Sequence, residues 1–336
     1  MIEILACPAP VSIQDGGRPG YRHLGVPLSG ALDPEWLAIA NALAGNPLTC
    51  AGLEMRLAGP RLQTDLSLTF AVAGDCEIRI EDIHGQRRQV PSWCSHHLAA
   101  GEILIVGRVK SGIAYLALAG GLELPSVLGS RSTYARAGFG GLHGRVLAGG
   151  DCLKVGAGDT PNPRYLPHPP GATDQPLRVM SGPQREHFTL AAWEQLISEG
   201  FTVSREADRM GLRLDGPTLE HDPAYGADIV SDAVTPGVIQ VPGDGHPIVL
   251  LADCQTVGGY PKIATVISAD LPRLGHALPG QTLRFVEVDI EQALAARRDA
   301  VAALAEQLAA IVPGTDGFDL DALYASNLID GVINAD

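Results

Sequence analysis

The sequence predicts a mainly β protein with two β-domains, a few helices and a C-terminal amphipathic helix. Short apolar or alternating runs recur at intervals of roughly ten residues in the first half, with turn residues between them, which is typical of a barrel or sandwich. The 336 residues include 40 glycines and 25 prolines without a collagen-like period, which suits many tight turns. MRLAGP at residues 55–60 resembles LRLDGP at 212–217. The two halves are therefore either related β-domains or similar by chance.

In the first half, residues 1–7 form the first predicted strand and residues 35–43 a helix. Asp33 is a suitable N-cap for this helix, and Pro34 a suitable first helical residue. The Gly-Asn-Pro sequence after residue 44 ends it. Further strands are predicted at residues 52–57, 66–72, 77–80, 103–106 and 113–119.

In the second half, we expect a strand at residues 177–181, a helix at 190–198 and an amphipathic helix at 289–311. The apolar face of that last helix is predicted from a spacing of three, four or seven residues. It comprises Ile290, Leu294, Val301, Leu304, Leu308 and Ile311.

The proline-rich residues 161–176 are typical of a linker, which places a domain boundary near residue 170. The predicted units are residues 1–170, residues 171–288, and a helix with its tail at 289–336. The tail at 318–336 mixes apolar and acidic residues, so it docks either on the body of the protein or on a partner.

Composition excludes several classes of function. Hydrophobic residues make up 46% and charged residues 18% of the chain, enough for a large core. A net charge of −14 argues against a nucleic-acid partner. The six cysteines form no CxxC pair, and neither a signal peptide nor a membrane-spanning run is apparent. We therefore predict a soluble, cytoplasmic protein.

Familiar cofactor and catalytic motifs are also missing from the sequence. It contains no Walker A loop, no GxGxxG after a strand, no HExxH and no GxSxG. The tetrapeptide that carries biotin is absent as well. We expect no metal site, and any ATP- or biotin-dependent chemistry requires other polypeptides.

The most informative stretch is residues 247–280, where two buried strands, 248–252 and 263–268, flank a polar, glycine-containing loop. The loop ends at Lys262, one of only three lysines in the chain. An ammonium group beside a Gly-Gly turn suits a carboxylate, carbamate or carbonyl oxygen. The alternative is a β-hairpin with an ordinary surface lysine.

Two further loops are rich in polar residues. The first, residues 12–34, groups several side chains that suit an anion or amide site. These are Gln14, Asp15, Arg18, Tyr21, Arg22 and His23. The alternative is a solvated loop whose Asp and Arg residues pair with each other. A second polar loop carries Arg131, Ser132, Thr133, Tyr134 and Arg136 between glycines.

Long motifs in these loops resemble a known family. They are IQDGGRPGYRHLGVPLSGALDP and LAGGLELPSVLGSRSTYARAGFGG in the first half, then READRMGLRLDGP and VTPGVIQVPGDGHPIVLLADCQTVGGYPKIATVISADLPRLG, and a closing GQTLRF. Across residues 4–286 the chain resembles the carboxyltransferase-subunit family that includes the C subunit of 5-oxoprolinase (the KipI antagonist KipA) and allophanate hydrolase subunit 2. It is also similar to one half of the carboxyltransferase domain of urea carboxylase.

The resemblance implies cyclophilin-like β-barrels and a tight complex with a KipI-like B subunit. With a LamB/YcsF-like A subunit, such a complex opens 5-oxo-L-proline to L-glutamate using ATP. One alternative is a carboxyltransferase subunit that works with a biotin carboxylase and carboxybiotin on urea or another amide. Another is a non-catalytic regulator of a KipI-like kinase inhibitor. In each case we expect the chain to bind no cofactor itself.

The resemblance also implies a set of site residues. Lys262 would polarise the substrate carbonyl, with Gln255 and Tyr260 as further catalytic candidates. The other expected substrate contacts are Thr256, Gly258, Gly259, Arg18, Asp15 and Arg209. Cys254 stands where arginine is expected, which leaves the identity of the amide substrate open.

Overall fold

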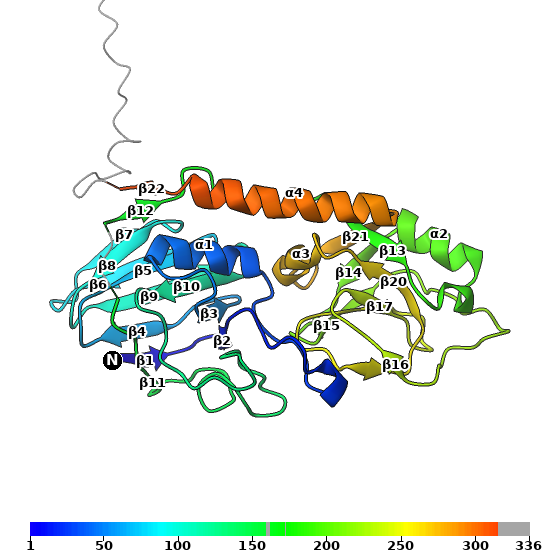
Figure 1. Cartoon of the computed structure of the whole chain (residues 1–336), viewed down its shortest axis with the longest axis horizontal. Helices are drawn as coiled ribbons and strands as arrows, with labels where there is room; N and C mark the ends of the chain where they lie inside the picture. Colours follow the sequence, from blue (N-terminus) through cyan, green and yellow to red (C-terminus); the bar gives the residue numbers. More distant parts are fainter. Residues whose placement is uncertain (159–161, 172, 315–336) are drawn as a thin grey trace, which may run out of the picture.

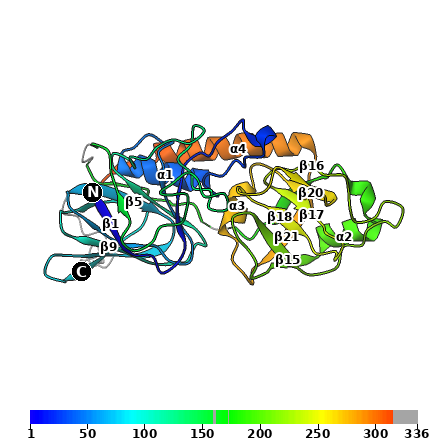
Figure 2. The ribbon, with the colours of Figure 1, turned by 90° about the horizontal axis from the view of Figure 1, so that it is seen from below.

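The computed structural model describes residues 1–158, 162–171 and 173–314. Two β-rich halves lie side by side, and one long helix, α4 (Ile290–Ala309), extends along both of them (Figure 1). The view from below shows the same arrangement (Figure 2). The prediction of a mainly β protein with few helices is confirmed. The tail at 318–336 lies outside the described residues, so its docking stays a prediction.

The N-terminal half consists of two antiparallel sheets. One sheet has the order β11 (Cys152–Leu153), β1 (Ile2–Ala6), β4 (Arg61–Thr64), β9 (Ile103–Val109), β6 (Cys76–Glu81), β7 (Arg87–Val90). The other has the order β2 (Val11–Gln14), β3 (Gly52–Met55), β10 (Ala114–Leu118), β5 (Leu68–Ala73), β8 (Ser95–Leu98). Side chains of both sheets form one hydrophobic cluster that includes Ile4, Leu53, Phe70 and Ile78. This half is therefore two packed sheets, and only the other half is a closed barrel.

The C-terminal half closes into a seven-stranded barrel. Its strand order is β13 (Leu177–Ser181), β20 (Lys262–Val266), β17 (Val238–Gln240), β18 (Ile248–Leu250), β15 (Gly211–Asp215), β14 (Gly200–Val203), β21 (Thr282–Glu287). Phe201, Leu212 and Ile263 are fully buried within it. The helix α2 (Leu190–Ser198) packs on β21, and the short helix η2 (Arg185–His187) lies against β20. The predicted boundary near residue 170 falls between β12 (Arg164–Tyr165) and β13.

The strands on either side of the Lys262 loop are not partners of each other. Both β18 and β20 pair with β17, which lies between them. The loop between them forms β19 (Val257–Gly258), which pairs with β16 (Asp232–Ala233) in a separate two-stranded ribbon. The hairpin alternative is therefore wrong, and the loop crosses one end of the barrel.

The helix α1 (Pro34–Ala44) begins and ends at the residues that the sequence indicates. The Asp33 side chain accepts hydrogen bonds from the backbone N–H groups of Glu35 and Trp36, as expected of an N-cap. Gly45 ends the helix in the left-handed conformation, with φ of 79°. The helix packs on β5 and β10, and its buried Trp36 contacts the ring of His276, the last residue of α3 (Leu271–His276).

The helix α4 is correctly predicted, but the N-terminal half of its predicted apolar face is wrong. Leu304, Leu308 and Ile311 pack on the core, whereas Ile290, Leu294 and Val301 are 56%, 54% and 53% exposed. Ala296 is buried instead. Small alanine side chains allow the first turns to pass close to the body, so this part of the helix packs through a face that the hydrophobic spacing did not identify.

The observed packing of α4 predicts different losses of stability for substitutions at two nearby positions of the helix. Leu294→Gln is expected to change the free energy of unfolding by less than about 0.5 kcal/mol, because the side chain is already in water. Ala296→Gln is expected to cost about 2–3 kcal/mol, because it crowds a close contact and buries an amide. Urea denaturation of both variants tests this. A larger loss for the Leu294 variant would contradict the observed packing.

The end of α4 returns to the N-terminal half. After the helix, β22 (Val312–Pro313) pairs with β12, so residues near the end of the described chain bond to residues near its middle. One hydrophobic cluster also includes residues of both halves, among them Trp36, Tyr115, Val179 and Ile239. Among the described residues, no helix combines the length and apolar character that crossing a bilayer requires.

Candidate functional site

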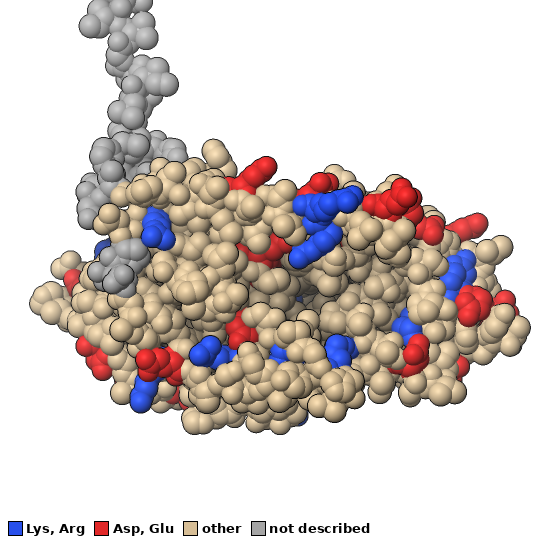
Figure 3. Space-filling model, in the orientation of Figure 1, with Lys and Arg blue, Asp and Glu red and all other residues tan. Residues whose placement is uncertain are grey.

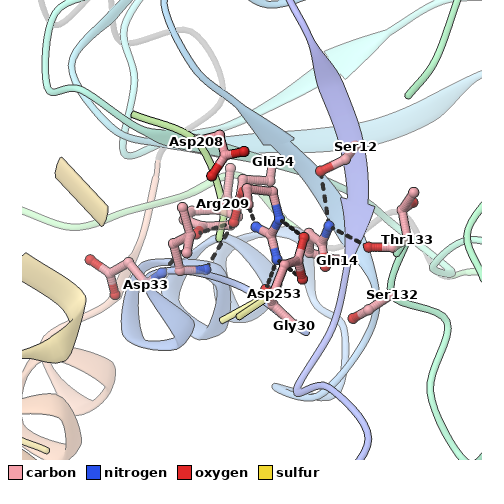
Figure 4. Close-up of polar contacts among 12 residues, drawn as sticks. Ser12, Gln14, Gly30, Asp33, Glu54, Ser132, Thr133, Asp208, Arg209 and Asp253 are labelled. Atoms are coloured by element: carbon pink, nitrogen blue, oxygen red, sulfur yellow. Dashed lines mark hydrogen bonds and ion pairs between the residues drawn. The ribbon is translucent and has the colours of Figure 1, made fainter. Parts of the chain in front are cut away.

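A buried ion network joins the two halves at Arg209. The Arg209 guanidinium bonds to a carboxylate oxygen of Glu54, and its Nε lies 2.9 Å from Oδ2 of Asp253. Its Nη2 also donates to the backbone oxygen of Gly30 at 2.6 Å. Figure 4 shows these groups converging on the guanidinium from both halves. Burial opposes the charge of Arg209, but the Glu54 and Asp253 carboxylates outweigh it and raise the pKa of Arg209.

Glu54 is in turn fixed by its own neighbours. Its Oε2 accepts hydrogen bonds from the Tyr115 hydroxyl at 2.7 Å and from the Leu32 N–H at 2.9 Å. Burial raises the pKa of Tyr115 well above its usual value, and Glu54 adds to that effect, so the phenol stays protonated and donates. Arg209 therefore has its hydrogen bonds satisfied inside the protein. Its predicted contact with substrate stays a prediction.

The two polar loops that lie far apart in the sequence meet in the structure. Asp15 accepts hydrogen bonds from the hydroxyls of Ser130 and Ser132, both at 2.6 Å, and from the Arg131 N–H at 2.5 Å. Both Asp15 and Arg18 are buried. The alternative in which Asp15 and Arg18 are solvated and pair with each other is therefore wrong, although residues 19–25 of the loop lie at the surface. Asp15 is the group that joins the first polar loop to the second.

Arg18 is a fully buried cation with an incomplete set of partners. One nitrogen donates to the backbone oxygen of Ser132, and the guanidinium lies 4.9 Å from the ring centre of Phe139. Its Nε and Nη1 have no hydrogen-bond partner within the part of the chain that the structure describes. Burial lowers the pKa of Arg18, and the carboxylates of Asp15 and Asp253 oppose that shift. A polar group bound at these nitrogens would lower the free energy of the site.

Lys262 lies in a different environment, at the start of β20. Its side chain is only 3% exposed, and its Nζ lies 2.6 Å from Oδ2 of Asp232. The alternative of an ordinary surface lysine is therefore wrong. Two glutamine side chains bond to the backbone next to this lysine. The Gln184 side-chain oxygen accepts a hydrogen bond from the Lys262 backbone N–H, and the Gln240 side-chain amide donates to the backbone oxygen of Tyr260. An ammonium in such a partly dehydrated place can stabilise negative charge on a bound oxygen.

The rest of the predicted loop holds this environment in place. The Gln255 amide donates to Oε1 of Gln240 at 3.3 Å. A side chain at Gly258 would come within 2.5 Å of the Gln240 nitrogen, so a larger residue there would displace the Gln240 amide. The backbone oxygens of Thr256 and Gly259 accept hydrogen bonds from Val234 and Ile229. The ring of Tyr260 is 41% exposed, and its catalytic role stays a prediction.

The structure adds three residues that the sequence analysis missed: Asp232, Gln184 and Gln240. Gln240 interrupts an otherwise apolar strand, VIQV, and a polar residue inside a core strand was a usable signal. Asp232 and Gln184 had none, because they reach Lys262 from other segments of the chain. The first loop also reaches this region, since Arg22 donates to the backbone oxygens of Val234 and Gln255.

Cys254, at the start of the same loop, is not placed as a nucleophile. It is fully buried, and burial raises the pKa of its thiol, with Asp253 adding to the shift and Arg22 opposing it. Burial also raises the pKa of Cys76 to about 12 and that of Cys94 to about 11. These thiols therefore hold their protons at neutral pH and carry little thiolate.

This gives a simple prediction for alkylation. At about pH 8, iodoacetamide is expected to modify the exposed Cys152 at least tenfold faster than Cys76, Cys94 or Cys254, because burial shields those three thiols and raises their pKa. Peptide mass spectrometry over time measures the four rates. Modification of Cys254 as fast as that of Cys152 would reveal a reactive thiol in the site.

The surface between the two halves is hollowed below α4, and basic side chains lie along both edges of the hollow (Figure 3). Acidic side chains also lie at the edges of the hollow and over the rest of this face. Within the described residues, no group of three or more His, Cys, Asp or Glu side chains is arranged to hold a metal ion.

Comparison with known proteins identifies the family. The family model for the carboxyltransferase domain, subdomain A and B, matches residues 24–287. The C subunit of 5-oxoprolinase from Escherichia coli K12 is 36% identical over 301 residues, covering 89% of this chain and 95% of the relative. The same subunit of Haemophilus influenzae is 37% identical and is covered over 94% of its length.

Longer proteins contain the same region. The crystal structure of Kluyveromyces lactis urea carboxylase matches with a TM-score of 0.82 and 29% identity, over 94% of this chain and 30% of that chain. The urea amidolyase of Saccharomyces cerevisiae is 31% identical over 86% of this chain and 17% of its own length. These relatives are therefore either enzyme subunits or parts of larger enzymes, and the resemblance drawn from the motifs is confirmed. The chain belongs to the carboxyltransferase domain family, subdomain A and B.

Proposed function

We propose that this chain is the C subunit of a multi-subunit, ATP-dependent 5-oxoprolinase that opens 5-oxo-L-proline to L-glutamate. The observation that carries the chemistry is the buried Lys262 side chain, whose ammonium bonds to Asp232 beside a loop held by Gln240 and Gln255. The choice of substrate rests on the bacterial relatives, which this chain covers over 95% and 94% of their length. It covers only 17% of the urea amidolyases.

In this mechanism, Lys262 stabilises negative charge on a substrate oxygen. As water attacks the lactam carbonyl and the C–N bond breaks, charge develops on the carbonyl oxygen, and a preorganised cation lowers the free energy of that state. Gln240 and Gln255 keep the surrounding loop in position. ATP would supply the driving force and would be bound by partner subunits, since this sequence has no Walker A loop.

A second candidate is a carboxyltransferase subunit for urea or another amide. It is favoured by the likeness to urea carboxylase over 94% of this chain. The same ammonium would stabilise charge on the amide oxygen while carboxybiotin, supplied by a biotin carboxylase partner, donates the carboxyl group.

Purification of the chain from its native cell distinguishes the two candidates. Mass spectrometry would identify the co-purifying chains, and an avidin blot would detect biotin in the same eluate. KipI-like and LamB/YcsF-like chains without biotin, together with ADP and glutamate release from 5-oxo-L-proline, are expected. A biotinylated carboxylase in the eluate, with no glutamate release, would reject the first candidate in favour of the second.

A further inference from the structure

The ion pair at Lys262 joins a buried group to an exposed one. The Lys262 side chain is 3% exposed, whereas that of Asp232 is 52% exposed. The Oδ1 atom of Asp232 accepts a hydrogen bond from the Ala233 N–H, and its Oδ2 atom binds the Lys262 ammonium. The Lys262 ammonium lowers the pKa of this carboxylate most, and the nearby Gln184 side chain lowers it a little further. The donors therefore belong to the barrel, and the carboxylate belongs to a segment outside it.

That segment, residues 222–233, is mostly exposed and is anchored at its ends. The Asp222 N–H bonds to the His187 oxygen at one end, and at the other Val234 is buried and accepts a hydrogen bond from Arg22. The ribbon of β16 and β19 has two residues in each strand. Beside it, the Ile229 N–H bonds to the Gly259 oxygen at 2.9 Å, and the Val234 N–H bonds to the Thr256 oxygen at 3.1 Å. Val230 is 93% exposed. Segments with few buried contacts and exposed backbone hydrogen bonds open at a low cost in free energy.

Opening this segment would leave a specific set of donors. Lys262 offers up to three N–H groups, and Gln184 offers its amide N–H, because the Gln184 oxygen already accepts from the Lys262 backbone. The group that best replaces an aspartate carboxylate on these donors is another carboxylate, since it restores both the charge and the two oxygens. A neutral ligand would leave the ammonium without its counter-charge in a partly dehydrated place.

We propose that Lys262 and Gln184 form a binding site for a small carboxylate, which Asp232 occupies until a ligand displaces it. The ligand carboxylate and the Asp232 carboxylate then compete for the same donors. With 5-oxo-L-proline, the carboxylate would take the place of Asp232, and a second N–H of the ammonium would remain for the lactam oxygen when charge develops there. This inference rests on the proposed function only in the choice of 5-oxo-L-proline as one probe. It requires neither ATP nor a partner subunit.

The lysine content of the chain makes the site easy to follow. Lys110 and Lys154, the only other lysines, are exposed and serve as internal references for acetylation by an N-hydroxysuccinimide ester. In the full-length protein, acetylation of Lys262 relative to Lys110 is expected to rise about three- to tenfold in Asp232→Ala, because the open fraction of the site increases. Asp228→Ala, which removes a carboxylate from the same segment, is the matched control and is expected to leave the ratio unchanged.

Three probes then identify the ligand chemistry. Acetate and 5-oxo-L-proline are expected to protect Lys262 from acetylation, and to do so at about three- to tenfold lower concentration in Asp232→Ala than in the wild type. The lactam 2-pyrrolidinone, which lacks the carboxylate, is expected to give no protection. An unchanged acetylation ratio in Asp232→Ala, no protection by either carboxylate, or protection by the lactam alone would overturn the proposal.

The outcomes separate this proposal from the proposed function. Protection by carboxylates without glutamate release from the assembled complex would reject the 5-oxoprolinase assignment and leave the carboxylate site standing. Glutamate release without any protection of Lys262 would reject the carboxylate site and leave the 5-oxoprolinase assignment standing.

Discussion

Lys262→Met is expected to lower kcat/KM of the assembled enzyme for 5-oxo-L-proline at least about a hundredfold, the usual loss when a preorganised donor to a developing oxyanion is removed. Methionine retains most of the length of the aliphatic side chain and removes only the charge and the N–H donors. The former partner, Asp232, is 52% exposed, so it can return to water without leaving a buried, unpaired charge. The loss should therefore appear in turnover with little change in melting temperature.

Lys110→Met is the matched control for this variant. Lys110 is exposed and lies 3.9 Å from Asp75 on the surface, so its removal is expected to leave turnover unchanged. ADP and glutamate release are measured in the reconstituted complex, with co-elution of the partner chains as a check on assembly. Wild-type turnover by an assembled Lys262→Met complex would remove Lys262 from the mechanism and favour a non-catalytic, regulatory role for the chain.

Arg209→Met is expected to be strongly destabilising, with a loss of about 3–5 kcal/mol in the free energy of unfolding. The variant leaves the Glu54 and Asp253 carboxylates in the junction between the halves without their shared cation. Glu54 is nearly inaccessible, with a side-chain exposure of 2%, so water cannot replace the arginine there. Chemical denaturation of the isolated chain measures the loss.

Arg213→Met provides the comparison for Arg209. Arg213 pairs with Asp244 on the surface, where the two side chains are 35% and 44% exposed. Exposed pairs contribute little, so the change is expected to stay within about 1 kcal/mol. Equal losses for the two variants would mean that the Arg209 network is not what holds the halves together.

Local signals in the sequence predicted the elements of the fold well. The cap at Asp33 and the glycine at residue 45 fixed the limits of α1, and the strand at 177–181 and helix at 190–198 have the predicted bounds. Periodicity was less reliable for α4, because that helix has two apolar stripes and spacing alone does not show which of them is buried. The second stripe contains alanines, whose small side chains let the helix lie close to the body of the protein but contribute little to a hydrophobic pattern.

The candidate site was only partly predictable. Lys262 stood out because lysine is rare in this chain and lies beside a glycine turn. The contact of Asp15 with Ser132 joins residues 117 positions apart, and the contact of Lys262 with Asp232 joins residues 30 positions apart. Neither pairing leaves a local pattern, since each depends on how the chain crosses the junction and the end of the barrel.

The return of the chain after α4 has a consequence for cooperativity. Because β22 bonds to β12, and because one hydrophobic cluster runs from Trp36 to the barrel interior, neither half can lose its structure without exposing apolar surface of the other. We expect a single melting transition in calorimetry, as in a one-domain protein. The change of architecture near residue 170 would then mark no weak point along which heat, denaturant or a protease could divide the molecule.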